Sequence, residues 1–592
     1  MATISEALTA AVAHHQAGRL QAAEQIYRQI LAVEPDQADA WHLLGVVAAH
    51  TGRPAMAVEH IRRAIALSGD QAVFHANLGN VLLDQGKLDE ALACYGRALA
   101  LNPNLAEVHH QRGLALAAQG KLDAAIACYR RAVEIRPGDA ESHYTLGAAL
   151  QKQEQVDAAT ACYRRALQLK PDYPEAHNNL GAVLKEQGKL DEAAACCRRA
   201  VELKPDFAEA YNNLGVVLND QEKLDEAVAC CRRAVELKPD DSEALNNLGN
   251  GLKDQGRLDE AVACYRRALE LRPNYAGAHA NLGLAWLLTG DWQRGWPEYE
   301  WRWRTKQLQP RPFAQPLWDG SSPAGKTILL YAEQGLGDTL QFVRYAPLVK
   351  SLGAMVIVEC QRPLRPLLAS CAGVDRLVAH GDELPAFDTH APLLSLPGIL
   401  RTALDSVPAA VPYLAAMPAL VEAWGEKLRD LRGFKVGINW QGRPGAGSWR
   451  ARNVPLRQFA ALAAMEGVRL VSLQKGPGRG ELAEVREHFP VFDPGEDVDQ
   501  AAGAFMDSAA IMMHLDLVIT SDTAVPHLAG ALGVPVWVAL PFAPDWRWML
   551  DRPDSPWYPT MRLFRQRERG DWQGVFAEIE AALRRQLELS CS

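Results

Sequence analysis

The sequence predicts an α-helical solenoid followed by two doubly wound α/β domains. Three observations support this fold class: a 34-residue self-similarity fills the first half, strand-like apolar runs alternate with helices in the second half, and two similar strand–loop–helix turns lie far apart within that second half. At 592 residues the chain is too long for a single hydrophobic core, so we expect several domains.

The repeat array is marked by glycines and prolines in a fixed phase. A typical unit, residues 177–210, reads as two amphipathic helices with a turn around Gly188 and a proline after the second helix. A first unit at residues 7–39 carries Ala11 in place of the phased glycine. We therefore expect about nine helical pairs over residues 1–303. The phased glycines are Gly45, Gly79, Gly113, Gly147, Gly181, Gly215, Gly249 and Gly283, and the prolines are Pro103, Pro137, Pro171, Pro205, Pro239 and Pro273.

This pattern resembles the tetratricopeptide repeat (TPR), including the small residue where the two helices approach and the closing proline. The resemblance implies a superhelix with a long concave groove, because single units cannot bury their apolar faces alone. Such a groove is expected to bind a protein partner.

Asparagines recur two positions before five of the phased glycines. An asparagine amide offers a donor and an acceptor together, so it can pair with a peptide backbone of any sequence. The array resembles the asparagine ladder of the O-GlcNAc transferases, whose repeats hold protein substrates. In the alternative interpretation these side chains bond neighbouring repeats. The predicted groove residues are Asn77, Asn179, Asn213, Asn247 and Asn281.

Cysteines and histidines also follow the repeat. Six cysteines recur at the 34-residue step, which places each in a different unit and favours small core thiols over a disulfide framework or metal site. Histidines stand four residues before five of the glycines, but Trp41 occupies the same place in another unit, so we expect a packing position. The cysteines are Cys94, Cys128, Cys162, Cys196, Cys230 and Cys264; the histidines are His75, His109, His143, His177 and His279.

Composition limits the class of partner. The net charge is −9 without long blocks of one sign, which disfavours nucleic acid and a polybasic membrane anchor. The N-terminus has no signal-peptide pattern, and the most apolar stretch near the C-terminus is too short to span a bilayer. We therefore expect a cytoplasmic protein without membrane insertion.

The last repeat leads into the second half through an aromatic segment. Trp292, Trp296, Trp301 and Trp303 suit a capping helix that docks on another domain. Residues 304–320 show no periodicity and are expected to be a linker that packs on the surface.

Strand-like runs then define two α/β domains, at residues 321–430 and 431–592. A helix over 418–431 separates two series of strands. Parallel sheets of this kind bind ligands beyond the carboxyl ends of their strands, so a cleft between the domains is expected. The predicted strands are residues 327–331, 354–359, 376–379, 391–394, 435–440, 468–473, 491–492, 517–520 and 536–540.

Two turns carry the candidate chemistry. In the first, Gly335 and Gly337 form a tight loop before Asp338, which begins a predicted helix. In the second, residues 521–523 place three helix-capping side chains between a strand and a helix over 524–532. Free backbone N–H groups at a helix start favour phosphate-bearing ligands.

The sequences GLGD at 335–338 and SDTAVPHLAGALGVP at 521–535 resemble glycosyltransferases of the bacterial heptosyltransferase type, which have the two-domain GT-B fold. The likeness covers most of residues 320–590. Repeats followed by such a half also resemble the O-GlcNAc transferase architecture and bacterial repeat-bearing flagellin glycosyltransferases. The resemblance implies a nucleotide-sugar as co-substrate.

The resemblance also implies residue roles. Asp338 matches the aspartate proposed as the base, which would take the proton from an attacking hydroxyl; alternatively it only caps its helix. Arg452 stands where the family has a lysine that stabilises the leaving phosphate, and Arg450 is close enough to be confused with it. A surface salt bridge is the alternative for both arginines.

The remaining donor-binding candidates lie on the second domain. Asp522 and Thr523 match the family's DTxxxH pattern together with His527, which could instead be a buried packing histidine. Ser521 begins the same turn. The weaker candidates Gln441, Gln474 and Lys475 follow the first two strands of the domain.

No cofactor and no metal are expected. Asp497 and Asp499 have the DxD form that metal-dependent transferases use, but they lie in an acidic loop outside the expected cleft, and chance explains the match better.

We therefore expect a metal-independent, inverting glycosyltransferase that modifies Ser or Thr of a protein acceptor held by the repeats; flagellin is suggested by architectural analogy alone. Two alternatives remain open. The acceptor could be a lipid-linked or surface glycan, or the chain could be an interaction scaffold with a degenerate catalytic half.

Overall fold

The computed structural model describes residues 3–305, 308–442 and 451–591. The chain forms two compact units, Met1–Val217 and Leu218–Ser592. Helix α13 (Ala208–Asp220) crosses the boundary between them.

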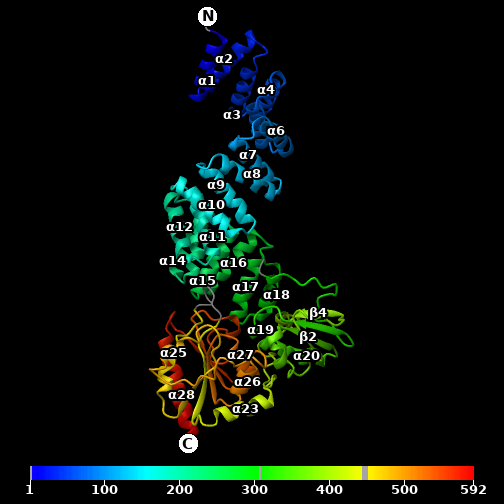
Figure 1. The fold of residues 1–592 in the computed structure, drawn as a ribbon. Helices are drawn as coiled ribbons and strands as arrows, with labels where there is room; N and C mark the ends of the chain where they lie inside the picture. The colour runs from blue at the N-terminus through cyan, green and yellow to red at the C-terminus, as the bar shows by residue number, and fades with distance from the viewer. Residues whose placement is uncertain (1–2, 306–307, 443–450, 592) are drawn as a thin grey trace. The chain divides into compact units, whose positions relative to one another are not determined.

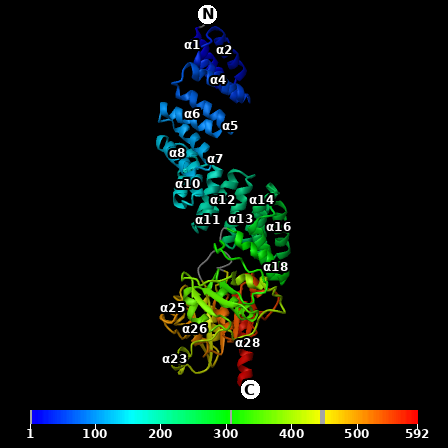
Figure 2. The same ribbon diagram turned by 90° about the vertical axis from the view of Figure 1, so that its right-hand side faces the viewer.

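The first unit is entirely helical, and its helices stack one after another in chain order (Figures 1 and 2). They alternate between 13 and 14 residues, and each pair fills one 34-residue repeat. The helices are α1 (Ile4–Gln16), α2 (Leu20–Val33), α3 (Ala38–His50), α4 (Pro54–Leu67), α5 (Ala72–Asp84), α6 (Leu88–Leu101), α7 (Ala106–Ala118), α8 (Leu122–Ile135), α9 (Ala140–Lys152), α10 (Val156–Leu169), α11 (Pro174–Glu186) and α12 (Leu190–Leu203).

The phased glycines allow the two helices of a repeat to touch. A Cβ on Gly79 would lie 2.5 Å from the ring of Tyr95, sixteen residues later, so no larger residue fits without moving a buried tyrosine. Gly113 meets Tyr129 in the same way, and Gly181 meets the thiol of Cys197. The predicted small residue at the close approach is confirmed.

The histidines four positions before the glycines make one repeated hydrogen bond. Nε2 of His109 lies 2.9 Å from the carbonyl of Pro103, and the Nε1–H of Trp41 donates to the carbonyl of Pro35 over 2.8 Å. Because a carbonyl oxygen can only accept, each histidine donates from Nε2 in this bond, as the indole N–H of Trp41 does. The predicted packing position is confirmed, with the added role of closing the turn between repeats.

The phased cysteines are less buried than expected. Cys128 is buried, but the other five are half-buried, so the prediction of buried core thiols is wrong for those five. The fully buried position belongs to Cys197 and Cys231, which replace the tyrosine that faces the phased glycine. The ten cysteines between Cys94 and Cys371 are free thiols.

In the second unit the repeats continue through α14 (Leu224–Leu237), α15 (Ser242–Asp254), α16 (Leu258–Leu271), α17 (Ala276–Thr289) and α18 (Trp292–Tyr299). Counted over the described residues, α1 to α18 make nine helical pairs, as predicted. A short 3-10 helix, η1 (Glu300–Arg304), follows.

Helix α18 docks through its aromatic face, as predicted for a capping helix. The Trp296 indole donates to the carbonyl of Thr402 over 3.1 Å, and its ring packs edge-on against Trp546. Trp292 stacks on Trp557 at 5.3 Å. The last repeat is thus built into the core of the α/β part.

The first sheet has four parallel strands in the order β3-β2-β1-β4. One face packs on α19 (Leu336–Phe342), α20 (Ala346–Ser351) and their neighbours. The other face is covered partly by the segment before the sheet, where Phe313 packs edge-on against Tyr331. The strands are β1 (Thr327–Tyr331), β2 (Met355–Cys360), β3 (Arg376–Ala379) and β4 (Thr389–Pro392).

The second sheet has five parallel strands in the order β6-β5-β7-β8-β9. Its strands lie between α28 (Trp572–Cys591) on one side and α23 (Pro418–Leu428), α26 (Met506–Met512) and α27 (Val525–Ala531) on the other (Figure 1). The strands are β5 (Phe434–Asn439), β6 (Val468–Ser472), β7 (Leu517–Ser521), β8 (Val536–Leu540) and β9 (Met561–Arg565).

Predictions about the α/β elements also need correction. Residues 393–394, predicted as the end of a strand, lie in the 3-10 helix η4 (Leu393–Ser395). The helix predicted from Asp338 to residue 352 is broken into α19, η2 (Val343–Tyr345) and α20, because Pro347 lacks the N–H that a continuous helix needs. The strand predicted at 491–492 is a single β-bridge between Phe492 and Val471. Strand β9 was not predicted.

Candidate functional site

The candidate site lies where the carboxyl ends of the two sheets meet within the second unit. In the first sheet the chain runs outward from β1 to β3 and returns to β4 on the other side of β1. In the second sheet it returns to β7 on the other side of β5. Loops at such switch points bind ligands in open α/β sheets. Asp338 follows β1 and Asp522 follows β7, so both candidate turns occupy switch points.

A chain of five alternating charges joins these loops. Asp338 pairs with Arg547, Arg547 pairs with Asp545 at 2.9 Å, Asp545 faces Arg452 at 3.4 Å, and Arg452 faces Asp522 at 3.3 Å. None of these side chains is more than 19% exposed. Residues that are widely separated in the sequence therefore form one buried ionic network.

Burial and pairing shift the proton affinities in this network. Burial would raise the pKa of Asp545, but the guanidinium groups of Arg547 and Arg452 overcome that effect and lower it to about 2. Burial raises the pKa of Asp522, against the opposing pull of Arg452. The network therefore holds one firmly ionised carboxylate between two arginines, and a second carboxyl that protonates more readily than usual.

Both oxygens of Asp338 are occupied. Oδ1 accepts from Arg547, and Oδ2 accepts from the backbone N–H of Gly335 over 2.8 Å, which caps the start of α19. The N-cap residue is Gly335, and Asp338 is the third residue of α19, so the prediction that Asp338 is itself the N-cap is wrong in position, although its carboxylate does help to cap the helix. The role of Asp338 as a base stays a prediction. Arg547 also donates from Nε to Gln341 over 2.8 Å, so its position is fixed from two sides.

The two candidate turns touch through Gly337 and His527. A Cβ on Gly337 would lie 3.1 Å from Cδ2 of His527 and 3.2 Å from Cα of Ala524. His527 is buried, stacks on Trp548, and lies 3.0 Å from the Tyr558 hydroxyl through Nδ1. Burial lowers its pKa well below the ordinary value, so the ring is neutral. These contacts fit the packing alternative for His527.

Residues after β5 and β6 form a second, uncharged network. Oε1 of Gln474 accepts from the backbone N–H of Trp440 and Gln441, and its Nε2 donates to three backbone carbonyls. Its amide therefore holds the two loops together. Thr523 donates to Oδ1 of Asn439 over 2.9 Å. The Ser521 hydroxyl is buried and has no hydrogen-bond partner in the described part of the chain.

The remaining predicted residues lie at different places. Lys475 faces Asp499 at 3.6 Å. Asp499 accepts from the backbone and hydroxyl of Ser508 at the start of α26, which gives this member of the DxD pair a structural role. Arg450 lies outside the described residues. Over the residues that are described, no group of three or more His, Cys, Asp or Glu side chains could hold a metal ion.

Sequence reasoning missed Arg547, Asp545 and Glu333. Glu333 lies in the loop after β1 with its side chain 1% exposed, and its Oε1 accepts from Arg302 over 2.9 Å. Its Oε2 is buried without a hydrogen-bond partner among the described residues. Burial raises the pKa of Glu333 to about 7, against the influence of Arg302. The residues DWR at 545–547 and E at 333 show no pattern that marks them before folding.

The phased asparagines bond from repeat to repeat. Nδ2 of Asn213 donates to Oδ1 of the buried Asn178 over 2.9 Å, and Asn281 makes the same bond to Asn246 over 3.0 Å. Nδ2 of Asn77 lies 2.8 Å from Nε2 of His42, again 35 residues earlier. The alternative in which these side chains bond neighbouring repeats is confirmed for these positions and for Asn179, which donates to Tyr144. The side chain of Asn247 accepts a hydrogen bond from its neighbour Asn246. Binding of an acceptor protein by these asparagines stays a prediction.

Comparison with known proteins accounts for the first half. Models described as "TPR repeat" match residues 79–120, 113–154 and 152–188, and models described as "Tetratricopeptide repeat" match residues 8–72, 174–207 and 206–274. The N-terminal half consists of TPR repeats. The second half folds as parallel α/β sheets.

One curated relative is "Protein FlbA" of Caulobacter vibrioides (strain ATCC 19089 / CIP 103742 / CB 15). It is 30% identical over 314 residues, which is 49% of this chain and 52% of that protein. The chain thus spans about half the length of this relative.

Solved structures of TPR proteins are also similar in part. YrrB, described as a TPR protein with an unusual peptide-binding site, is 28% identical over 32% of this chain and 97% of its own, with a TM-score of 0.30. The APC/C hetero-tetramer Cut9–Hcn1 is 18% identical over 45% of this chain and 52% of its own, with a TM-score of 0.36. MamA is 28% identical over 27% of this chain and 95% of its own, with a TM-score of 0.27. TM-scores below 0.5 are too low to carry a conclusion.

Among the described helices, none combines the length and the apolar composition that a bilayer span needs.

Proposed function

We propose that the protein is a glycosyltransferase of the GT-B type that transfers a sugar from a nucleotide-sugar to a Ser or Thr hydroxyl of a protein held by the TPR repeats. The observation that carries the proposal is the network from Asp338 to Asp522, which brings two arginines to the meeting point of two switch-point edges. A flagellin acceptor is part of the proposal only by analogy of architecture.

The two arginines suit a diphosphate. Transfer breaks the bond between the anomeric carbon and the phosphate oxygen, and the bonding electrons leave with the nucleoside diphosphate. Arg452 and Arg547 would stabilise that developing charge, because a mostly buried guanidinium acts in a low-dielectric setting and needs little reorganisation. Both arginines now pair with aspartates. When a diphosphate binds, its oxygens would replace some of these carboxylates as the anionic partners of the arginines.

The easily protonated Asp522 assists this exchange. Its raised pKa means that it can take up a proton when phosphate oxygens approach Arg452, which removes one negative charge from the site. In this proposal Asp522 belongs to the donor site through its charge beside Arg452.

Two carboxylates are candidates for the base that takes the acceptor proton. Asp338 lies between the sheets, but Arg547 and the N–H of Gly335 already donate hydrogen bonds to its two oxygens. Glu333, on the same loop, has a buried oxygen without a hydrogen-bond partner and a pKa of about 7, which suits a base at neutral pH. Attack by the deprotonated hydroxyl on the face opposite the phosphate would invert the anomeric configuration.

A donor panel tests the proposal. The full chain is incubated with UDP-, GDP- and CMP-linked sugars and candidate acceptor proteins, and the intact acceptor mass is measured. We expect one donor to add the mass of a sugar to a protein, and Arg452→Gln to reduce the rate by about a hundredfold or more, as for loss of one transition-state contact.

The variants Asp338→Asn and Glu333→Gln separate the two bases. General-base catalysis is worth about a hundred- to ten-thousandfold, so the variant that removes the base lowers kcat by that factor while KM for the donor changes little. Transfer to a purified glycolipid instead of protein would contradict the acceptor assignment. Absence of transfer and of nucleotide binding with every donor would contradict the enzyme itself.

A further inference from the structure

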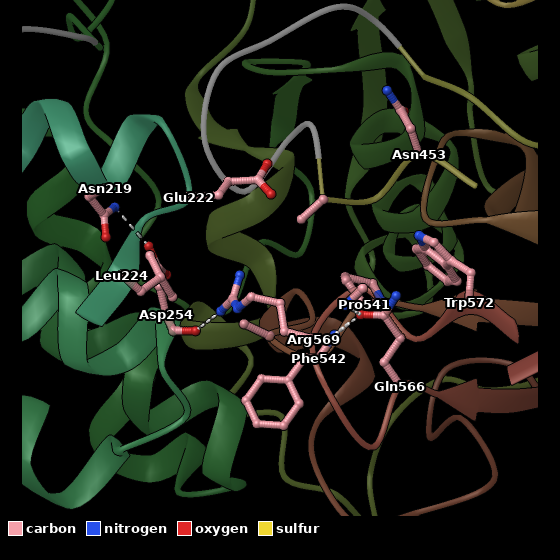
Figure 3. Close-up of a pocket in the computed structure, with 13 residues that line it drawn as sticks. Asn219, Glu222, Leu224, Asp254, Asn453, Pro541, Phe542, Gln566, Arg569 and Trp572 are labelled. Atoms are coloured by element: carbon pink, nitrogen blue, oxygen red, sulfur yellow. Dashed lines mark hydrogen bonds between the residues drawn. The ribbon is translucent and has the colours of Figure 1, made fainter. Parts of the chain in front are cut away.

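A cavity of about 170 Å³ lies away from the ionic network, between the repeats and the second sheet, entirely within the second unit. Figure 3 shows its two walls. Glu222, Leu224 and Asp254 come from the turn after α13 and from helices α14 and α15. Phe542 comes from the loop after β8, and Trp572 is the first residue of α28.

Gln566 places an unused donor in this cavity. Its Oε1 accepts from the backbone N–H groups of Phe542 and Gly570, both over 3.1 Å, which fixes the orientation of the amide. The other end, Nε2, is buried and has no hydrogen-bond partner within the described part of the chain. Gln566 is only 6% exposed, so this N–H group has lost water without a replacement.

Glu222 supplies an acceptor on the opposite wall. Its carboxylate extends from the repeat turn toward the sheet side of the cavity (Figure 3). No ion pair or hydrogen bond of this side chain is found among the described residues. A ligand between the walls can therefore accept from Gln566 and donate to Glu222.

The charges around the cavity nearly cancel. Glu222 and Asp254 are anionic, whereas Lys253 lies 3.5 Å from Asp254, and Arg569 donates to the Asp254 carbonyl. A phosphate would meet two carboxylates, and a basic side chain would meet the guanidinium of Arg569. A neutral ligand fits best, and the apolar walls at Leu224, Phe542 and Trp572 favour one with an apolar face.

We infer that this cavity binds a single neutral sugar ring. A pyranose carries hydroxyls that both donate and accept at short spacing, and its C–H face packs on aromatic rings. A volume of about 170 Å³ is below the roughly 300 Å³ at which pockets for whole drug-sized ligands begin, which favours one ring over an entire nucleotide-sugar. The cavity is a carbohydrate subsite at the junction of the repeats and the second sheet.

This subsite is distinct from the proposed donor site. Its wall includes Ala451 and Asn453, the neighbours of Arg452 in the chain, whereas the Arg452 side chain faces Asp522 and Asp545. Sugar binding here does not require turnover. The two proposals can therefore fail separately.

Ligand-observed NMR titration tests the subsite on the full chain. The probes are the methyl glycosides of glucose, galactose, mannose and N-acetylglucosamine, measured in the absence of nucleotide. We expect at least one probe to bind, and Gln566→Glu to weaken it about tenfold or more, because this isosteric change keeps Oε1 for the two backbone bonds and removes the free donor. Glu222→Gln is expected to weaken binding similarly, since it removes the charge and keeps the shape.

Glu154→Gln is the matched control. Glu154 stands 68 residues before Glu222, two repeats earlier in the same turn, with the same left-handed backbone (φ 60° against 64°), and does not line the cavity. The Glu154→Gln variant is expected to bind the glycoside probe as tightly as the unmodified protein does. Arg452→Gln should also retain probe binding, which separates this subsite from the donor site.

Three outcomes would overturn the inference: no glycoside binds, the two cavity variants bind as well as the Glu154 control, or a neutral peptide amide such as N-acetylglycinamide competes with the bound glycoside at equal concentration.

Discussion

The repeats and the α/β part build their polar contacts in opposite ways. In the repeats each bond recurs at a constant separation: Gly79 meets Tyr95 sixteen residues on, and Asn213 reaches Asn178 thirty-five residues back. In the α/β part, Arg547 meets Asp338 across 209 residues, with no periodicity. The first kind of contact is visible in the sequence, whereas the second requires the folded sheets. We therefore expect many small, similar contributions to stability in the repeats, and a few large contributions from buried charges in the α/β part.

The largest change in the free energy of unfolding should come from removing Arg547, the cation that pairs with both Asp338 and Asp545 in the ionic network. Arg547→Met leaves Asp338 and Asp545 buried with only Arg452 near the latter, and loss of one partner of a buried ion pair typically costs about 3–5 kcal/mol. Denaturant unfolding of the full chain measures this.

Arg584→Ala is the control for that variant. It removes a surface pair with Glu580 whose arginine side chain is 57% exposed, and such pairs contribute about 0.3–0.5 kcal/mol. Equal losses from both variants would show that the network is no more important to stability than an ordinary surface pair.

The second-largest effect is a dependence of folding stability on pH, which arises from Glu333. Its folded pKa is about 7, above the ordinary 4.5, so between these values the folded chain keeps a proton that the unfolded chain releases. Stability therefore falls as the pH rises through this window, by on the order of 3 kcal/mol in total, and the loss is complete above the folded pKa.

Glu333→Gln should flatten that slope. Unfolding free energies at about pH 5 and about pH 8 give the comparison, with the exposed Glu422→Gln as control. An unchanged slope in Glu333→Gln would place the folded pKa near its ordinary value and remove the case for Glu333 as the base.

The third effect tests the helix contact within a repeat. Gly79→Ala drives a methyl group into the ring of Tyr95 and should destabilise by about 1–3 kcal/mol. Gly96→Ala, in α6 with nothing within 4 Å of its Cβ, should instead stabilise by up to about 1 kcal/mol through helix propensity. Opposite signs in thermal unfolding support the contact, and equal signs contradict it.

The smallest effect concerns the asparagines. Asn213→Ala removes the bond to the buried Asn178 and should cost about 1 kcal/mol, whereas Asn104→Ala at an exposed position should cost less than half of that. If the two variants are equally stable, the bond between repeats contributes nothing measurable and a role in acceptor binding gains weight.

Much of the fold could be predicted because its signals are local. The phased glycines gave nine helical pairs, and β1, β3 and β8 have the predicted bounds. Strand β9 was missed because the chain before it, at residues 546–558, is rich in tryptophan and irregular and shows no helix leading into a parallel strand. The helix after Asp338 is shorter than predicted because the apolar pattern continues past the break at η2 (Val343–Tyr345), which precedes Pro347.

The candidate site was predictable only in part. Asp338, Arg452 and Asp522 were found from their motifs and lie in one network. Arg547 and Asp545, which connect them, carry no motif, and their role depends on the loop after β8 reaching the loop after β1. Gln474 follows its strand as predicted, but only the folded structure shows that both ends of its amide already have hydrogen-bond partners.

Nucleotide binding by the full chain tests the central claim most directly. Calorimetric titration with UDP, GDP and CMP, free and sugar-linked, compares the unmodified protein with Arg452→Gln and Asp338→Asn. We predict that one nucleotide binds, that Arg452→Gln weakens it by about tenfold or more, and that Asp338→Asn retains it, since the arginines bind the phosphate and the carboxylate acts on the acceptor. No binding by any nucleotide, or equal binding by Arg452→Gln, would contradict the account.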